Sequence, residues 1–375
     1  MIKFYRILDW WLIRKHRQQP RPGKARGVLL VSSGGLGDTV LFSHVIERFL
    51  GCADKDEPVT VLLRSDAMKM EFLLPPDIQV NAVDFNRLRK DLGYRRGITD
   101  TLFAAHYRLV VHTDFLRHPD LDEALVQAAM AEDAVAMEPR PWRKYDSRLN
   151  ANRALYSRLF DSGPAVQDKV LRWSCFADWI LGLDRSPPTI SLDLAQLPVA
   201  AEEGPDVIIQ PFSAVKAKQS SPALYRRIID DLVEGTQVAI TGTQGDLGDN
   251  PEFKDLLDLS GVVYDSSSFA ELIPYLRSAK MVISVDTALM HLAVAVGAPT
   301  LGLTSAAFVG EIVPYDPAIT PENAHFLYTP MPCEGCLGNC IHPLQHGRFP
   351  CVAQLDENQV IRTSREIMST KRGYV

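Results

Sequence analysis

The sequence predicts an α/β protein with two parallel sheets, one in each half of the chain. Two observations carry this prediction. Short β-branched runs alternate with helical stretches in both halves, as strands buried between two layers of helices do. A proline-rich polar stretch, residues 184–205, separates the halves and suits an inter-domain linker. The length of 375 residues also fits two domains.

The composition is that of a globular protein, with 46% hydrophobic and 23% charged residues. The net charge of −6 gives no case for a nucleic-acid partner, and none is predicted. The first 27 residues depart from this balance, because they hold eight Lys or Arg against Asp9 alone. Five apolar side chains of this arm share one face of the predicted helix: Phe4, Ile7, Leu8, Trp11 and Leu12.

The apolar run within the arm, residues 1–27, is too short and too interrupted to span a bilayer, and no small-residue cleavage site follows it. We therefore expect a cytoplasmic protein without a signal peptide. Residues 1–17 suit an anionic membrane surface, which would place the protein peripherally at the inner membrane. Packing of the arm on the protein's own body or on another subunit is an equal alternative.

The first half begins with a buried strand at residues 27–32, a glycine-rich turn and a helix that starts near Asp38. Further strands are predicted at residues 59–64, 78–83 and 109–113, with a helix over residues 40–50. Residues 142–179 are predicted to be mostly helical and irregular. These elements define a first domain, residues 28–190.

The second half repeats the alternation. Strands are predicted at residues 206–210, 237–241, 262–264, 281–285 and 300–304, and helices at residues 225–234 and 269–278. They define a second domain, residues 206–350, followed by a C-terminal helix within residues 351–375. Two α/β halves joined by a linker imply a cleft, and ligands bind preferentially in such clefts.

Reactive groups gather where the strand at 281–285 gives way to a helix. Asp286 and Thr287 stand at the N-cap, and His291 lies on the second turn of the same helix. Gly297 ends the helix and Pro299 blocks its continuation. The free N–H groups and the dipole of such a helix favour a phosphate. The alternative is an ordinary capped helix with a satisfied boundary histidine.

Three other turns at predicted strand ends carry complementary groups. The first combines small glycines, which let the backbone approach a ligand, with the carboxylate of Asp38. The second carries Ser213 and two cations, Lys216 and Lys218, which suit a phosphate. The third carries Asp246 after a strand that ends in TGT. Each turn alone has a structural explanation: Asp38 as an N-cap, and the lysines as solvated loop residues.

Three segments together resemble the ADP-heptose heptosyltransferase family, which includes the lipopolysaccharide core and autotransporter heptosyltransferases. They are SSGGLGDTVLFSHVI at residues 32–46, QPFSAVKAKQSSPALY at residues 210–225 and DTALMHLAVAVGAP at residues 286–299. The last corresponds to the strongest family signature. The chain departs from the pattern in three places: Ala288 replaces the usual glycine, Ser220 stands where the family has Trp, and LTSAAFVGEIVPY replaces a second-domain segment.

The resemblance implies the GT-B glycosyltransferase fold, in which two Rossmann-like domains face a central cleft. It also implies an inverting transfer of a sugar from a nucleotide diphosphate without a cofactor for catalysis. Inversion in one displacement needs a base, for which Asp38 is the candidate, and Lys218 would stabilise the leaving diphosphate. The residues expected to bind the donor are Gly37, Ser213, Asp246, Asp286, Thr287, Ala288 and His291.

Four of the six cysteines form a cluster with the pattern C-x2-C-x3-C-x10-C: Cys333, Cys336, Cys340 and Cys351. In a cytosolic protein, metal ligation is a more common use of such spacing than disulfides. Four thiolates can close a tetrahedral site for structural zinc or iron. A branch of the family that glycosylates autotransporter proteins resembles this arrangement and holds a metal. The alternative is four reduced, partly buried thiols.

The resulting prediction is an enzyme that moves a heptose-like sugar from an ADP-linked donor to a hydroxyl group. A lipid acceptor in the lipopolysaccharide core suits the basic arm, and a protein acceptor suits the cysteine cluster and a homo-oligomer. Two rival functions remain at this point. One is a catalytically silent, metal-stabilised binding or assembly protein with the same fold, and the other is a GT-B sugar-nucleotide epimerase.

Overall fold

The structure, a computed structural model, describes residues 4–370. It divides into two compact units, Met1–Ser186 (unit 1) and Pro187–Val375 (unit 2). The division falls inside the stretch 184–205 that the sequence marks as a linker. None of the helices in the described part of the chain is long and apolar enough to cross a membrane.

Unit 1 is built on a six-stranded sheet with the strand order β3-β2-β1-β4-β5-β6, in which all neighbours are parallel. Its strands are β1 (Val28–Ser32), β2 (Val59–Arg64), β3 (Gln79–Val83), β4 (Leu109–His112), β5 (Asp133–Met137) and β6 (Arg158–Phe160). Every residue of β1 and β4 is buried, because helices cover both faces of the sheet.

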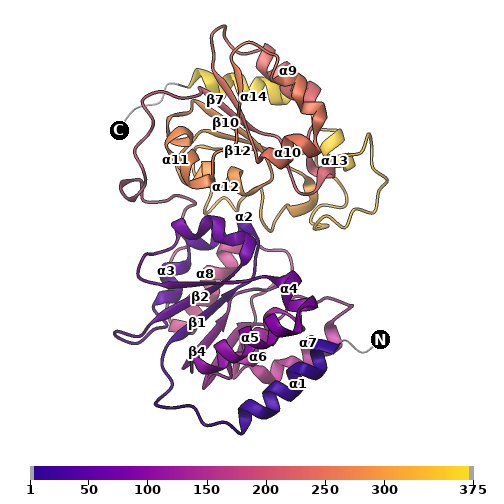
Figure 1. Ribbon diagram of the computed structural model, residues 1–375. Coiled ribbons are helices and arrows are strands. Elements are labelled where there is room, and N and C mark those ends of the chain that lie inside the picture. Colours follow the sequence, from indigo (N-terminus) through magenta and orange to yellow (C-terminus); the bar gives the residue numbers. More distant parts are fainter. Residues whose placement is uncertain (1–3, 371–375) are drawn as a thin grey trace. The chain divides into compact units, whose positions relative to one another are not determined.

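The helices of unit 1 form two layers (Figure 1). They are α1 (Phe4–Arg17), α2 (Leu36–Ser43), α3 (Ile46–Leu50), α4 (Phe85–Lys90), α5 (Leu92–Ala104), α6 (Asp122–Ala129), α7 (Asp146–Asn152) and α8 (Lys169–Leu181), with 3-10 turns η1 (Ser65–Leu73) and η2 (Arg153–Leu155). On one face, Phe42 of α2 packs edge-on against Trp173 of α8, with ring centroids 5.4 Å apart. On the other face, Leu102 of α5 and Leu125 of α6 share a core with β1.

Unit 2 repeats this plan with the parallel strand order β12-β11-β10-β7-β8-β9. Its strands are β7 (Val207–Gln210), β8 (Val238–Thr241), β9 (Val262–Asp265), β10 (Met281–Val285), β11 (Thr300–Leu303) and β12 (Ala324–Leu327). Its helices are α9 (Pro222–Asp230), α10 (Gln244–Asp249), α11 (Phe269–Ser278), α12 (Ala288–Ala295), α13 (Pro350–Ala353) and α14 (Glu357–Ser369). Four 3-10 turns complete it: η3 (Leu194–Gln196), η4 (Lys216–Lys218), η5 (Pro251–Leu256) and η6 (Ala306–Phe308).

The strand order reverses at one point in each sheet, between β1 and β4 in unit 1 and between β7 and β10 in unit 2. The chain leaves the two strands beside such a point toward opposite sides, so that the loops at their carboxyl ends separate. A crevice opens there, and it is the usual ligand site of open α/β sheets. In this protein the four turns singled out in the sequence follow β1, β7, β8 and β10.

The predicted α/β fold with two parallel sheets is confirmed, one helix prediction is wrong, and three edge or inner strands were missed. The helix expected over residues 40–50 is two helices, α2 and α3, and it begins earlier, at Leu36. The stretch 142–179 is mostly helical and irregular, as predicted, but it also contains the short edge strand β6. Strands β5 and β12 were not predicted, since β5 (DAVAM) lacks a β-branched run and β12 (AHFL) is an incompletely buried edge strand.

Candidate functional site

In unit 2, Lys218 and Asp286 form a shielded ion pair beside the reversal point. Strands β7 and β10 are paired in parallel, so that the segments after their carboxyl ends are neighbours. Lys218 Nζ lies 2.7 Å from Asp286 Oδ2, and it donates a hydrogen bond of 3.1 Å to the carbonyl oxygen of Asp286. The two side chains are only 12% and 7% exposed. The ring of Phe308 in η6 lies under the ammonium group, at 4.5 Å.

The helix that follows Asp286 presents a polar N-terminus. Thr287 is the N-cap of α12, yet among the described residues its side chain makes no capping hydrogen bond to the helix. Its hydroxyl points back to the carbonyl oxygen of Val285, at 3.3 Å. The first N–H groups of α12, beginning at Ala288, therefore receive no acceptor from the N-cap side chain and can bind an anion.

His291 lies on the second turn of α12, as predicted, but inside the unit. The residue is 2% exposed, and its Nδ1 lies 2.7 Å from the hydroxyl oxygen of Tyr315. Because the ring packs inward, the role that this position supports is to hold the helix rather than to reach a ligand.

The other predicted residues of unit 2 occupy loop positions. Ser213 Oγ accepts a hydrogen bond from the N–H of Val215, at 3.2 Å, in the loop after β7. Asp246 caps α10, because its Oδ2 accepts from the N–H of Thr243 at 2.7 Å. Lys216 is exposed and donates to the carbonyl oxygen of Asp249. Lys218 thus differs from Lys216 in being shielded and paired with another candidate residue.

In unit 1, Asp38 lies in the first turn of α2, beside Gly37. Its Oδ2 accepts a 2.8 Å hydrogen bond from the N–H of Gly35, which is the capping contact expected of an N-terminal carboxylate. Its Oδ1 lies 2.5 Å from Nζ of Lys169, at the start of α8. A Cβ on Gly34 would come within 2.4 Å of the Asp38 Cβ, so the close turn requires glycine. Gly35 and Lys169 thus hold the two carboxylate oxygens of Asp38 in a defined orientation at the start of α2.

Behind this turn lies a buried cluster that sequence analysis missed. The N–H of Ser33 donates to Asp114 Oδ2 at 2.6 Å. His112 Nε2 lies 3.8 Å from Asp114 Oδ2 and 3.7 Å from Asp122 Oδ2. Ligand atoms of these three side chains lie within 4.8 Å of one another, and among the described residues theirs is the one such set that could hold a metal ion. An imidazole with two carboxylates is a donor set that suits a divalent cation.

The pKa values of the cluster reflect its burial. Burial lowers the pKa of His112 to about 4, with the nearby Arg117 acting in the same direction. Burial raises the pKa of Asp122 to about 6, and it also raises that of Asp114. The imidazole is therefore neutral near pH 7, and the cluster supports the Ser33 turn from within the core.

We expect His112 and Asp122 to affect the pH dependence of stability in opposite directions. Between about pH 4 and pH 6 the folded state holds a proton on Asp122 that the unfolded chain has released, so this group lowers stability as pH rises. His112 does the reverse, because the unfolded chain binds a proton that the buried ring lacks. The two contributions largely cancel in the wild type.

Asp122→Asn removes one of them. When the pH is raised from about 4.5 to about 6.5, the free energy of unfolding of the variant is then expected to increase by roughly 2 kcal/mol more than that of the wild type does. Urea unfolding at both pH values measures this change. A variant curve that runs parallel to the wild-type curve would show that the two groups do not compensate.

Lys169 and Phe308 are two further residues of the candidate site that were not identified from the sequence. Lys169 follows Asp168, whose side chain caps α8 by accepting from the N–H of Val170. An aspartate before a helix is a recognisable sequence pattern, but it does not indicate that Lys169 contacts Asp38, which is 131 residues away in the chain. Phe308 lies in the segment that departs from the family pattern, and only the fold brings its ring to Lys218.

The four clustered cysteines line one small cavity in unit 2. It has a volume of about 10 Å³, and its other lining residues include Phe349 and His342. Burial, with the neighbouring thiols, raises the pKa of Cys333 and of Cys351. All four are free thiols. They are separate from the possible metal-binding set in unit 1, which consists of His112, Asp114 and Asp122. Soft sulfur donors around one cavity suit zinc or iron.

The cysteine segment is attached to the turns that carry Lys218 and Phe308. The N–H of Phe349 donates to the carbonyl oxygen of Ala217 in η4, at 2.9 Å. The N–H of Leu337 donates to the carbonyl oxygen of Ala307 in η6, at 2.8 Å. Because η4 and η6 position the ion pair and its ring, the cysteine segment braces this side of the candidate site.

Comparison with solved structures shows the GT-B fold. Similar structures include E. coli heptosyltransferase WaaC with ADP, at 18% identity over 91% of this chain and 99% of that chain, with a TM-score of 0.66. A glycosyl transferase of family 9 from Veillonella parvula DSM 2008 matches at 14% identity over 92% and 97%, with a TM-score of 0.64. The iron-containing dodecameric glycosyltransferase TibC from enterotoxigenic E. coli H10407 matches at 15% identity over 93% and 77%, with a TM-score of 0.51.

No curated protein sequence matches the chain. The family model of glycosyltransferase family 9 (heptosyltransferase) matches residues 123–334, which is more than half of the chain. This match spans η4, the ion pair, α12 and η6. The protein therefore belongs to glycosyltransferase family 9, the heptosyltransferase family.

Proposed function

We propose that the protein transfers a heptose-like sugar, with inversion, from an ADP-linked donor to an acceptor hydroxyl. The observation that carries this proposal is the shielded Lys218–Asp286 pair beside the N-terminus of α12, at the reversal point of the unit 2 sheet. A cation and free backbone N–H groups are what a departing diphosphate requires. Two relatives support the donor: E. coli WaaC was solved with ADP-2-deoxy-2-fluoro heptose, and TibC with ADP-D-beta-D-heptose.

The proposed reaction is a single displacement. The acceptor oxygen attacks the anomeric carbon of the donor sugar, and the proton of the acceptor hydroxyl passes to the carboxylate of Asp38. The bond between the anomeric carbon and the diphosphate oxygen breaks, and its electron pair leaves with ADP. Lys218 stabilises the negative charge that develops on the diphosphate, together with the N–H groups at Thr287 and Ala288.

The remaining candidates bind or orient the donor in this proposal. Asp286 accepts hydrogen bonds from sugar hydroxyls, and Ser213 and Gly37 lie in turns that approach the donor. Asp246 lies near the nucleoside. His291 supports α12 through Tyr315. Ala288, which replaces the usual glycine, keeps its N–H but brings a Cβ toward the phosphates, so that donor specificity is most sensitive at this position.

The acceptor is either a hydroxyl of the lipopolysaccharide core or a hydroxyl of a protein. The basic helix α1 favours the lipid. The cysteine cluster favours the protein, because the sequence resembles the autotransporter-glycosylating branch of the family at these cysteines. A homo-oligomer and a cytoplasmic location at the inner membrane remain predictions.

A screen of nucleotide sugars tests the donor. ADP-heptose at about 100 times its Kd is expected to stabilise the protein by about 2.7 kcal/mol, seen as a rise in Tm, and to release ADP in the presence of acceptor. GDP- and UDP-sugars should do neither. Binding of ADP-heptose without transfer to any acceptor would contradict the proposal and favour the catalytically silent protein. Conversion of the nucleotide sugar into its epimer, without an acceptor, would favour the epimerase.

We also propose that Cys333, Cys336, Cys340 and Cys351 hold one structural zinc or iron ion. Such an ion would hold the cysteine segment closed against η4 and η6. Protein purified without chelator is expected to contain about one metal ion per chain, and Cys336→Ser with Cys340→Ser should lose it and lower the Tm. Elemental analysis and thermal unfolding measure both effects. Cys175→Ser is the matched control, because that exposed cysteine lies outside the cluster, and equal metal loss there would contradict the assignment.

A further inference from the structure

Helix α1 turns large apolar side chains toward the solvent. Four of them are exposed: Phe4 (76%), Ile7 (53%), Trp10 (63%) and Trp11 (47%). Their spacing places them on one side of the helix, which we call the α1 apolar face. Leu12 and His16, farther round the helix, are buried, so the prediction that Leu12 shares a face with Phe4, Ile7 and Trp11 is wrong. A helix on the surface of a globular protein normally shows the reverse arrangement.

The buried side of α1 is fixed to unit 1 by ion pairs. Asp9 accepts two hydrogen bonds of 2.6 Å from Arg95, which is itself buried. Arg6 binds the carboxylate of Asp120 through two hydrogen bonds of 3.1 and 2.9 Å. At the other end of the helix, His16 Nε2 lies 2.8 Å from Asp100 Oδ1. The α1 apolar face is therefore presented by a docked helix rather than by a loose arm.

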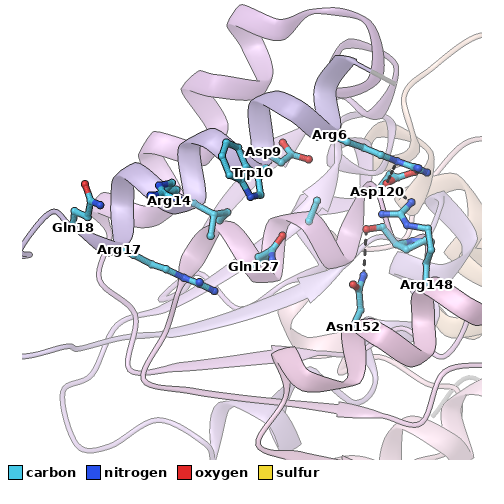
Figure 2. A pocket seen from close by; sticks show the side chains of 13 residues that line it. Arg6, Asp9, Trp10, Arg14, Arg17, Gln18, Asp120, Gln127, Arg148 and Asn152 are labelled. Carbon is cyan, nitrogen blue, oxygen red and sulfur yellow. Dashed lines mark hydrogen bonds and ion pairs between the residues drawn. The ribbon is translucent and has the colours of Figure 1, made fainter. Parts of the chain in front are cut away.

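A basic pocket runs along the same helix (Figure 2). It has a volume of about 450 Å³. Its charged lining residues are Arg6, Arg14, Arg17, Arg148, Asp9 and Asp120. Both aspartates are already neutralised, since Asp9 pairs with Arg95 and Asp120 pairs with Arg6 and Arg148.

Two cations of this pocket remain available to a ligand. Within residues 4–370, no ion pair engages Arg14 or Arg17. The guanidinium of Arg14 lies 5.7 Å from the ring of Trp10, and the ammonium of Lys15 lies 5.9 Å from the ring of Trp11. Positive charge therefore flanks the exposed aromatic rings directly.

We propose that α1 is an in-plane membrane-binding helix for bilayers that contain anionic lipids. The α1 apolar face enters the boundary between headgroups and acyl chains, where tryptophan is favoured. Arg14 and Arg17 bind lipid phosphates, to which the guanidinium group is matched in geometry. A second copy of the chain fits this surface less well, because a symmetric contact would bring the cationic helix against itself.

This inference deepens the proposed function, since it assigns the lipid side of the two acceptor classes and rests on that function for its use. Membrane binding itself needs neither donor nor acceptor. A protein that binds bilayers without transferring sugar would leave this inference standing and overturn the proposed function. A protein that transfers sugar without binding bilayers would support the proposed function and overturn this inference.

Vesicle co-sedimentation of the full chain tests the inference. The wild type is expected to bind vesicles of phosphatidylcholine with 30% phosphatidylglycerol, and to bind pure phosphatidylcholine at least about tenfold more weakly. Trp10→Ser with Trp11→Ser should weaken binding to the mixed vesicles by about tenfold or more. Arg14→Gln with Arg17→Gln should weaken it by about 30-fold at low salt, and added salt should reduce that difference.

Matched controls use exposed residues on other surfaces of the protein. Val199→Ser with Val233→Ser removes two side chains that are 81% and 80% exposed. Arg89→Gln with Lys90→Gln removes two exposed cations of α4. Both controls are expected to bind mixed vesicles as the wild type does. Failure of the wild type to bind, equal losses in the controls, or a homodimer that dissociates on replacement of Trp10 and Trp11 would overturn the proposal.

Discussion

Asp38→Asn is expected to lower kcat by about 10²–10⁴-fold, which is the usual contribution of a positioned general base. The amide is nearly isosteric with the carboxylate, and its oxygen can still accept the hydrogen bond from the N–H of Gly35. It cannot take the proton of the acceptor hydroxyl. Donor binding should change little, because the residues proposed to hold the diphosphate lie in unit 2. Single-turnover transfer with saturating donor measures the loss.

Lys169→Met provides the control for this substitution. It removes the same ion pair while leaving the carboxylate of Asp38 in place. We expect a loss of less than about tenfold, because the base itself remains. If Lys169→Met were as inactive as Asp38→Asn, the ion pair rather than proton transfer would explain the loss.

Lys218→Met is expected to lower kcat by about 10²–10³-fold, the range found when one electrostatic contact to a developing charge is removed. The same change should lower the free energy of unfolding by about 3–5 kcal/mol, because it leaves the shielded carboxylate of Asp286 without its cation. Both effects are large, so they must be separated. ADP release with donor in excess measures the first, and urea unfolding measures the second.

The double variant Lys218→Met with Asp286→Asn separates them. It removes the unpaired charge, and we expect it to regain most of the lost stability while it remains inactive. Lys216→Ala is the matched control for a nearby cation, since that side chain is exposed and donates a hydrogen bond to the carbonyl oxygen of Asp249 rather than pairing with Asp286. It should keep near wild-type activity. Recovery of transfer in the double variant would mean that Lys218 acts on stability alone.

Local sequence signals predicted the elements around Asp286 correctly. The β-branched run before Asp286 predicted β10, and the polar pair followed by helical spacing predicted the start of α12. Gly297 ends that helix with a φ of 81°, a conformation that favours glycine. These features depend on a few adjacent residues, which is why the sequence shows them.

Contacts between segments that are far apart in the chain were harder to predict from the sequence. The sequence placed Lys218 and Asp286 at separate turns, and only the adjacency of β7 and β10 brings them to 2.7 Å. The contact of Lys169 with Asp38 was not predicted, because α8 was part of a stretch without clear periodicity. The same holds for His112, whose β-strand pattern gave no sign of the carboxylates that face it.

For this protein, then, the sequence by itself determined the α/β class, most strands and helices, the chemistry of the turns after β1, β7, β8 and β10, and the family. The tertiary structure decided which of these turns are neighbours, the docking of α1 with its apolar face outward, and the attachment of the cysteine segment to η4 and η6. The physical reason is the range of the interactions. Helix and strand periodicity is set by neighbours a few residues apart, whereas strand order and side-chain pairing depend on packing between segments that are far apart in the chain.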